Sequence, residues 1–215
     1  MRVVIGLFLL SACFSMQPET LSIAYAAEHP GPYLTGVDTV AYHGILEPGI
    51  GNCKVDWEAW NTSIDFVANQ STKLKLLTDI EHHKRADKLA DKNKAFEATK
   101  PPLSKWNDDD RNEWQSNADA FSKYLFAPRL SFDIITIETG AACAAVIISD
   151  VTMAVKPAKT IATDIFVSVP NISVWSETRS LSGPLRGFSK FVVQTSEEML
   201  KGFINDWAAS QREPF

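Results

Sequence analysis

The sequence predicts an α+β domain with a mainly antiparallel sheet and two or three helices, of which the amphipathic C-terminal helix packs on one face of the sheet. The first observation is a series of three segments rich in Ile, Val, Thr and Phe, separated by short turns with Gly or Pro: Leu130–Thr139, Ala144–Val155 and Asp164–Trp175. The second is the last segment, Met199–Ala208, whose apolar residues recur four positions apart. Strands that follow one another directly favour antiparallel pairing, and the apolar face of the last helix must be buried on the sheet.

The N-terminus has the pattern of an export signal. A positive charge at Arg2 precedes an uncharged, mostly apolar run over residues 3–14. This run is shorter than the about 20 residues that a membrane-spanning helix needs. A small-x-small cleavage pattern ends at Ala26, so residues 1–26 are expected to be removed as a signal peptide.

Two alternatives to cleavage after Ala26 stay open. The residues before Cys13 read Leu-Ser-Ala, which resembles the lipobox of bacterial lipoproteins. In that case residues 1–12 are removed, and Cys13 is acylated and tethers the chain to a membrane. In the other case the apolar run is a buried segment of a cytoplasmic protein.

The composition indicates a folded, mildly acidic chain. With 45% hydrophobic residues, six Trp and twelve Phe, the sequence has too much apolar side-chain volume for a disordered protein. The chain after the signal has the ordinary size of one domain. A net charge of -5 argues against a nucleic-acid-binding protein, because such proteins usually carry a basic stripe.

Cys53 and Cys143 are the cysteines left for the folded domain with either signal ending. In an oxidising compartment the simplest state of these two thiols is one disulfide, which would close a long loop. The alternatives are two buried free thiols or a redox-active pair, and the absence of a C-x-x-C motif disfavours the redox role.

The regular part of the domain is expected to begin only at residue 63. Residues 27–62 are rich in Pro and Gly and read as an irregular lead-in with one strand near Val37–Ile45. The single α+β domain then covers residues 63–211, beginning with strands at Ser63–Ala68 and Lys73–Leu77, where apolar and polar residues alternate.

Two polar helices follow these strands. Thr78 and Glu81 have capping-box spacing, so a solvated helix should run from there to about Ala98 and end before two prolines. Asn107 can cap a second helix, in which Trp114, Ala118, Phe121 and Leu125 form one apolar stripe. We expect this second helix and the C-terminal helix to pack on the same face of the sheet.

The C-terminal part is expected to hold one more strand and the last helix. Ser182-Gly183-Pro184 marks a turn, and Phe188–Gln194 has strand character. Thr195 and Glu198 repeat the capping-box spacing, which places the start of the last helix just before Met199.

The candidate site residues are few. His82 and His83 are weak metal-ligand candidates, because adjacent helical residues point about 100° apart, and a solvated helix face explains them better. Trp57, Trp60 and Trp175 are candidates for a binding surface, with core packing as the alternative. No motif for a cofactor is present, so we expect none.

The function expected from these observations is binding rather than catalysis. Export without a catalytic motif favours a non-enzymatic protein of the cell envelope, periplasmic or lipid-tethered, which binds an envelope protein or a small ligand and no nucleic acid. The alternative is an extracytoplasmic enzyme, such as a hydrolase, whose site joins His43 or His82 with distant carboxylates. Convergence of these groups in a deep pocket would favour the enzyme.

Overall fold

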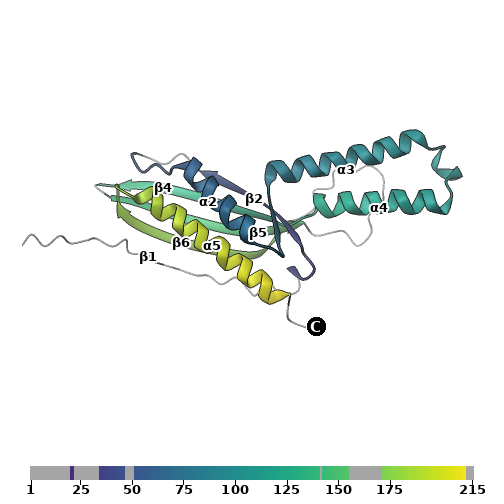
Figure 1. Ribbon diagram of the computed structural model, residues 1–215. Coiled ribbons are helices and arrows are strands. Elements are labelled where there is room, and N and C mark those ends of the chain that lie inside the picture. Colours follow the sequence, from purple (N-terminus) through teal and green to yellow (C-terminus); the bar gives the residue numbers. More distant parts are fainter. Residues whose placement is uncertain (1–19, 22–33, 47–50, 141, 155–170, 212–215) are drawn as a thin grey trace, which may run out of the picture.

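The computed structural model describes residues 20–21, 34–46, 51–140, 142–154 and 171–211 (Figure 1). Its strands are β1 (Thr20–Leu21), β2 (Thr39–Leu46), β3 (Lys75–Thr78), β4 (Arg129–Thr139), β5 (Ala142–Ala154) and β6 (Asn171–Pro184). Its helices are α2 (Trp57–Gln70), α3 (Asp79–Thr99), α4 (Asp108–Leu125) and α5 (Phe188–Ser210), with a 3-10 turn at Leu103–Lys105. The predicted α+β class is therefore confirmed.

The strands form one mixed sheet in the order β1-β6-β5-β4-β2-β3. The half built from β4, β5, β6 and β1 is antiparallel, as expected. In contrast, β2 runs parallel to both of its neighbours, β3 and β4. The sheet is not purely antiparallel because α2 connects β2 to β3, and a helical crossover returns the chain in the same direction.

The core lies between one face of the sheet and the helices α2 and α5, which run side by side across it (Figure 1). On β4, Leu130, Phe132 and Ile134 point to these helices and are fully buried. Ser131 and Asp133 alternate with them on the opposite face and are half-buried. This alternation is the pattern of a sheet with one face packed on a core.

The C-terminal helix is confirmed but starts earlier than predicted. Phe188–Gln194 is not a strand, because the buried residues Phe188 and Val192 continue the spacing that leads to Met199 and Phe203. The second capping box is also wrong. Ser196 is fully buried inside α5, where its hydroxyl donates to the Val192 carbonyl, 2.9 Å away.

The strand predicted at Ser63–Ala68 is wrong, because this segment belongs to α2. The period-two interpretation placed Phe66 on the buried face with Ile64, but Phe66 is 65% exposed. The buried residues Trp60, Ile64, Val67 and Ala68 follow the helical period instead. Asp56 caps the helix by accepting from the Ala59 N–H, so regular structure begins inside the segment 27–62 that was expected to be irregular.

Helices α3 and α4 form an antiparallel pair that extends away from the sheet, and we call residues 79–125 the arm (Figure 1). Both predicted caps are confirmed as capping boxes, from Thr78 with Glu81 and from Asn107 with Asp110. The predicted packing of the second helix on the sheet is wrong. Trp114, Ala118 and Phe121 of its apolar stripe are only half-buried, and α4 packs mainly against α3.

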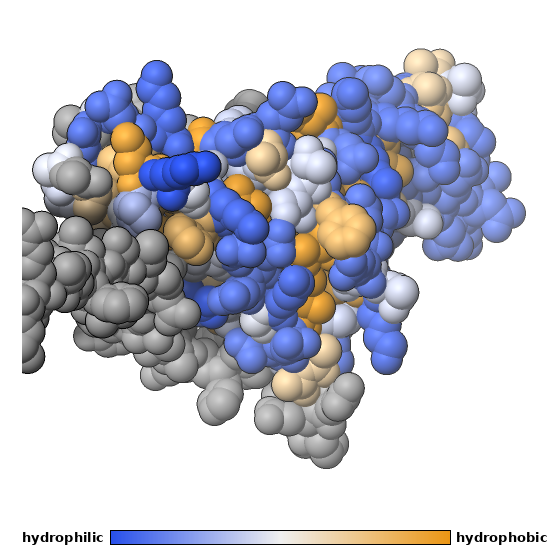
Figure 2. All heavy atoms as spheres, turned by 60° about the vertical axis from the view of Figure 1, so that its left-hand side comes forward, coloured by the Kyte–Doolittle hydropathy of each residue, from blue (hydrophilic) through white to orange (hydrophobic). Residues whose placement is uncertain are grey.

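Polar contacts add to the small apolar interface between α3 and α4. Lys100 donates to Asp110 over 2.6 Å, and Trp114 donates to Glu97 over 2.7 Å. The visible surface of the arm is mostly hydrophilic, whereas the body shows scattered hydrophobic residues (Figure 2). A helix pair with so polar an exterior remains solvated along its length.

The remaining strand predictions succeed in part. Lys73–Leu77 overlaps β3, and two of the three long strands correspond to β4 and β5. The third predicted strand corresponds to β6, which begins at Asn171. Because β6 runs through residues 182–184, the turn predicted there is wrong. Residues 164–170 of the expected strand lie outside the described residues.

Candidate functional site

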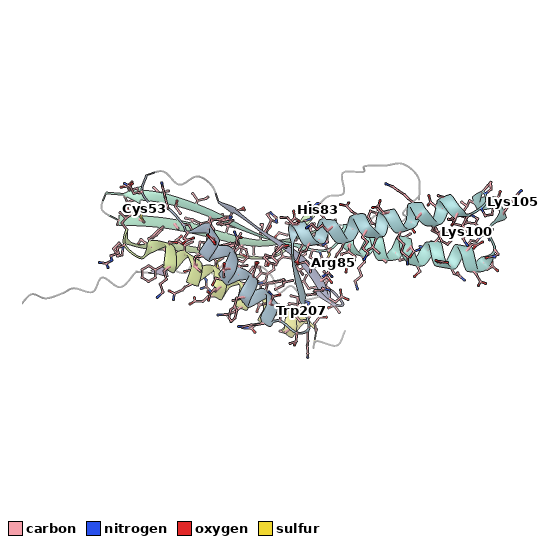
Figure 3. All side chains as sticks on the ribbon, turned by 45° about the horizontal axis from the view of Figure 1, so that its top comes forward. Cys53, His83, Arg85, Lys100, Lys105 and Trp207 are labelled. Carbon is pink, nitrogen blue, oxygen red and sulfur yellow. A yellow bond between two sulfur atoms is a disulfide. The ribbon has the colours of Figure 1, made fainter. Side chains whose placement is uncertain are left out.

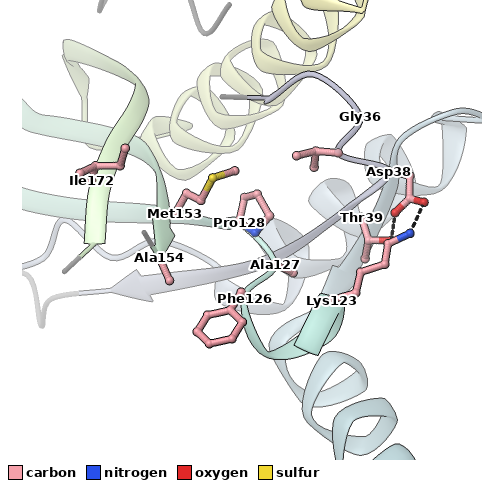
Figure 4. Close-up of a pocket in the computed structure, with 11 residues that line it drawn as sticks. Gly36, Asp38, Thr39, Lys123, Phe126, Ala127, Pro128, Met153, Ala154 and Ile172 are labelled. Atoms are coloured by element: carbon pink, nitrogen blue, oxygen red, sulfur yellow. Dashed lines mark hydrogen bonds and ion pairs between the residues drawn. The ribbon is translucent and has the colours of Figure 1, made fainter. Parts of the chain in front are cut away.

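An apolar pocket of about 400 Å³ opens where the arm joins the body (Figure 4). It lies between the start of β2, the corner between α4 and β4, the end of β5 and the start of β6. Its apolar lining consists of Val37, Phe126, Ala127, Pro128, Met153, Ala154 and Ile172. The volume is within the range of small-molecule sites in proteins.

Backbone and side-chain hydrogen bonds fix the walls of this pocket. Pro128 cannot continue α4, and its carbonyl accepts from the Ala41 N–H of β2 over 3.0 Å. On the opposite wall the Val37 carbonyl accepts from the Trp207 indole of α5 over 2.9 Å. The corner, β2 and α5 are thus tied together around the pocket.

One ion pair stands among the polar lining residues. The Lys123 ammonium, from α4, donates to Asp38 over 2.6 Å, and the Thr39 hydroxyl donates to the other oxygen of the same carboxylate (Figure 4). The hydrogen bond from Lys123 holds the pKa of Asp38 below its usual value. Both partners are more than half exposed, so the pair adds at most about 1 kcal/mol to stability. It can instead interact with the polar end of a ligand whose apolar part fills the pocket.

The tryptophans expected at a binding surface lie elsewhere. Trp60 is buried in the core, stacks on the half-buried Trp57 with ring centroids 4.5 Å apart, and donates to Ser196. Trp175 is buried against Phe203 and donates to Asp206 over 2.9 Å. Trp60 and Trp175 therefore pack in the core and present no exposed aromatic surface.

The two adjacent histidines have different environments. His83 is exposed, and its Nδ1 lies 2.8 Å from the Asp79 carbonyl. His82 is 2% exposed and packs against Tyr124 of α4 with ring centroids 5.9 Å apart. Among the described residues no group of three His, Cys, Asp or Glu side chains is arranged to hold a metal ion.

Neither His43 nor His82 lines the pocket. His43 lies on β2, opposite Ser131 of β4 in the sheet register. His82 lies in the first turn of α3, where the arm begins. The structure therefore places neither candidate base of the enzyme alternative in this pocket.

The expected disulfide between Cys53 and Cys143 is present, and both residues are buried. It lies at the end of the body that is remote from the tip of the arm. Figure 3 labels Cys53 at this end of the body and Lys105 at the tip of the arm. Cys13 and the rest of the expected signal segment, apart from Thr20 and Leu21, lie outside the described residues.

Sequence reasoning missed the pocket. Its lining comes from four separate segments, and each carries ordinary loop or strand residues such as Val37 or Ile172. Only the break of α4 at Pro128 was visible as a local signal.

The sequence matches no known protein family and no curated protein. Within the described part of the chain, none of the helices combines the length and the apolar character needed to cross a membrane.

Proposed function

We propose that this protein is an exported, non-enzymatic binding protein of the cell envelope, and that the pocket where the arm joins the body takes a small apolar ligand. The observation that carries the proposal is the apolar lining of this 400 Å³ pocket next to a single exposed ion pair. Apolar walls with a few polar groups are typical of ligand sites, because the walls supply affinity and the polar groups fix the orientation.

The extracytoplasmic location is supported by the disulfide. Cys53 and Cys143 are bonded in the buried core, and structural disulfides persist in oxidising compartments. The export signal predicted for the N-terminus agrees with such a compartment.

The pairing of β1 with β6 favours the lipoprotein ending over cleavage after Ala26. Thr20 and Leu21 pair antiparallel with Leu181 and Ser180, so cleavage after Ala26 would remove a strand of the sheet. We expect the mature protein to begin at an acylated Cys13. Intact-mass spectrometry of the protein isolated from its host tests this, and a mass that begins at residue 27 without an acyl chain would contradict it.

Ligand binding can be tested with an uncharged, polarity-sensitive dye such as N-phenyl-naphthylamine. We expect saturable fluorescence enhancement with the oxidised protein at pH 7.5. Replacing Ala154, which lines the pocket, by Phe fills part of the volume and should weaken dye binding at least tenfold, which corresponds to about 1.4 kcal/mol.

The matched control for this substitution is Ala98→Phe on the exposed surface of the arm. It adds the same apolar area far from the pocket, so the dye affinity should stay within twofold of the wild-type value. Equal effects of the two substitutions would refute the pocket as the binding site. Turnover of ester or peptide substrates by the purified protein would refute the non-enzymatic role.

A further inference from the structure

His82 is a buried imidazole at the end of the arm that joins the body, where α3 begins and α4 ends. We call this end the arm root. It lies in the first turn of α3, is 2% exposed, and has no hydrogen-bond partner for Nδ1 among the described residues. Its ring contacts the ring of Tyr124 on α4, with ring centroids 5.9 Å apart. His82 thus joins the two helices of the arm where they meet the body.

The charges around His82 favour its neutral form. The positive charge of Arg129 on β4 acts against a proton on His82, and His83 lies next to His82 on α3 with ring centroids 6.1 Å apart. Asp79 is the main opposing charge, but it is shared with Arg129, 4.0 Å away, and with His83, 3.7 Å away. The positive end of the α3 dipole adds to the cost of a charged imidazole.

Two described carboxylates near the sheet side of the arm root, Asp65 and Glu81, already have partners. Tyr42 of β2, which pairs with Thr78 in the register, donates to Asp65, and burial with this bond raises its pKa far above the physiological range. Glu81 is exposed, and its carboxylate caps the Thr78 N–H. A proton on His82 would therefore be poorly compensated.

These contacts lower the pKa of His82 below its ordinary value of 6.5, through burial first and Arg129 second, against the smaller opposing effects of the Tyr124 backbone and Asp79. The pKa of His82 is lowered only while the arm root is closed, so its imidazole binds a proton more tightly when the arm root is open. The closed arm root is thus fully stable above pH 6.5 and loses stability as the pH falls toward the folded-state pKa.

The arm root also forms one wall of the pocket. Tyr124, which His82 contacts, is followed by Phe126 and Ala127 in the pocket lining, and Arg129 follows the lining residue Pro128. We propose that His82 is a proton-operated switch that opens the arm root in mildly acidic surroundings and releases the apolar ligand. This inference rests on the proposed function for its link to the ligand.

Hydrogen exchange tests the opening of the arm root without any ligand. Between pH 6.5 and 5 the protection factors of the amides near His82 should fall in the wild type by up to tenfold per pH unit, the limit for uptake of one proton. This extra fall should vanish in His82→Gln. The matched control His83→Gln removes the exposed neighbour, which has the smallest of the effects on the pKa of His82, and should keep most of the wild-type pH dependence.

Two further measurements make the test independent of how well His82→Gln folds. In the wild-type protein an NMR titration should give His82 a pKa below its ordinary value of 6.5, and the dye should dissociate more readily at pH 5 than at pH 7.5. A normal pKa for His82, or equal pH dependence of exchange in wild type and His82→Gln, would overturn the switch. Dye affinity that does not change while the arm root opens would overturn its link to the pocket.

The failure of the proposed function can be told apart from these outcomes. If the dye does not bind at pH 7.5, the ligand-binding function and the release of a ligand both fail. The exchange and NMR data still decide whether His82 opens the arm root.

Discussion

Replacing Cys53 and Cys143 together by alanine is expected to lower the free energy of unfolding by about 4–5 kcal/mol. The disulfide joins residues separated by 90 positions, and it ties the segment before α2 to the start of β5. In the loop-entropy description a cross-link over such a distance removes conformational entropy from the unfolded chain and raises its free energy by about this much. Alanine is chosen because both sites are buried and a serine hydroxyl would lack a partner.

Denaturant unfolding under oxidising and reducing conditions provides the measurement. Reductant should shift the midpoint of the wild type to that of the double variant and should leave the double variant unchanged. A wild-type midpoint that is insensitive to reductant, together with two titratable thiols, would show that the cysteines are unpaired in the native protein.

Trp60→Ala should be nearly as damaging, at about 3–5 kcal/mol. The side chain is 1% exposed, stacks on Trp57, and meets the edge of Phe132 with centroids 5.5 Å apart. Its indole N–H donates to the buried Ser196 over 2.9 Å, so the substitution also leaves a hydroxyl without this donor. The stacked indoles pack tightly against β2, because a Cβ added at Gly44 would lie 2.5 Å from Trp57.

Phe66→Ala is the matched control for this substitution. Phe66 is an aromatic residue of the same helix, but it is 65% exposed. Its removal should change the free energy of unfolding by no more than about 0.5 kcal/mol. Equal losses for Trp60→Ala and Phe66→Ala in denaturant unfolding would mean that α2 does not pack on the sheet through Trp60.

The elements that sequence alone predicts correctly are those with local chemical signals. Thr78 and Asn107 mark the starts of α3 and α4 through side chains that bond within one helical turn. The alternation of β4 and the apolar face around Met199 are also contained in short windows.

The errors arise where two periods fit one short window or where distant contacts decide. Ile64 and Ala68 fit both a strand and a helix, and only the capping by Asp56 and the contact of Trp60 with α5 select the helix. The apolar stripe of α4 was matched to the wrong partner, because a sequence shows that a face is apolar but not what covers it. The pocket was missed for a related reason, since its walls meet only through pairings such as Ala41 with Pro128.

The parallel pairing of β2 with β4 has a consequence for how fast the chain folds. Ala41 must find Arg129 across the whole of α2, β3 and the arm, and closing so long a loop is entropically slow. Helices α3 and α4 can form early from local contacts, and once paired they bring the chain back close to where it left the sheet. The arm then shortens the effective loop, so weakening its capping boxes should retard refolding more than it accelerates unfolding.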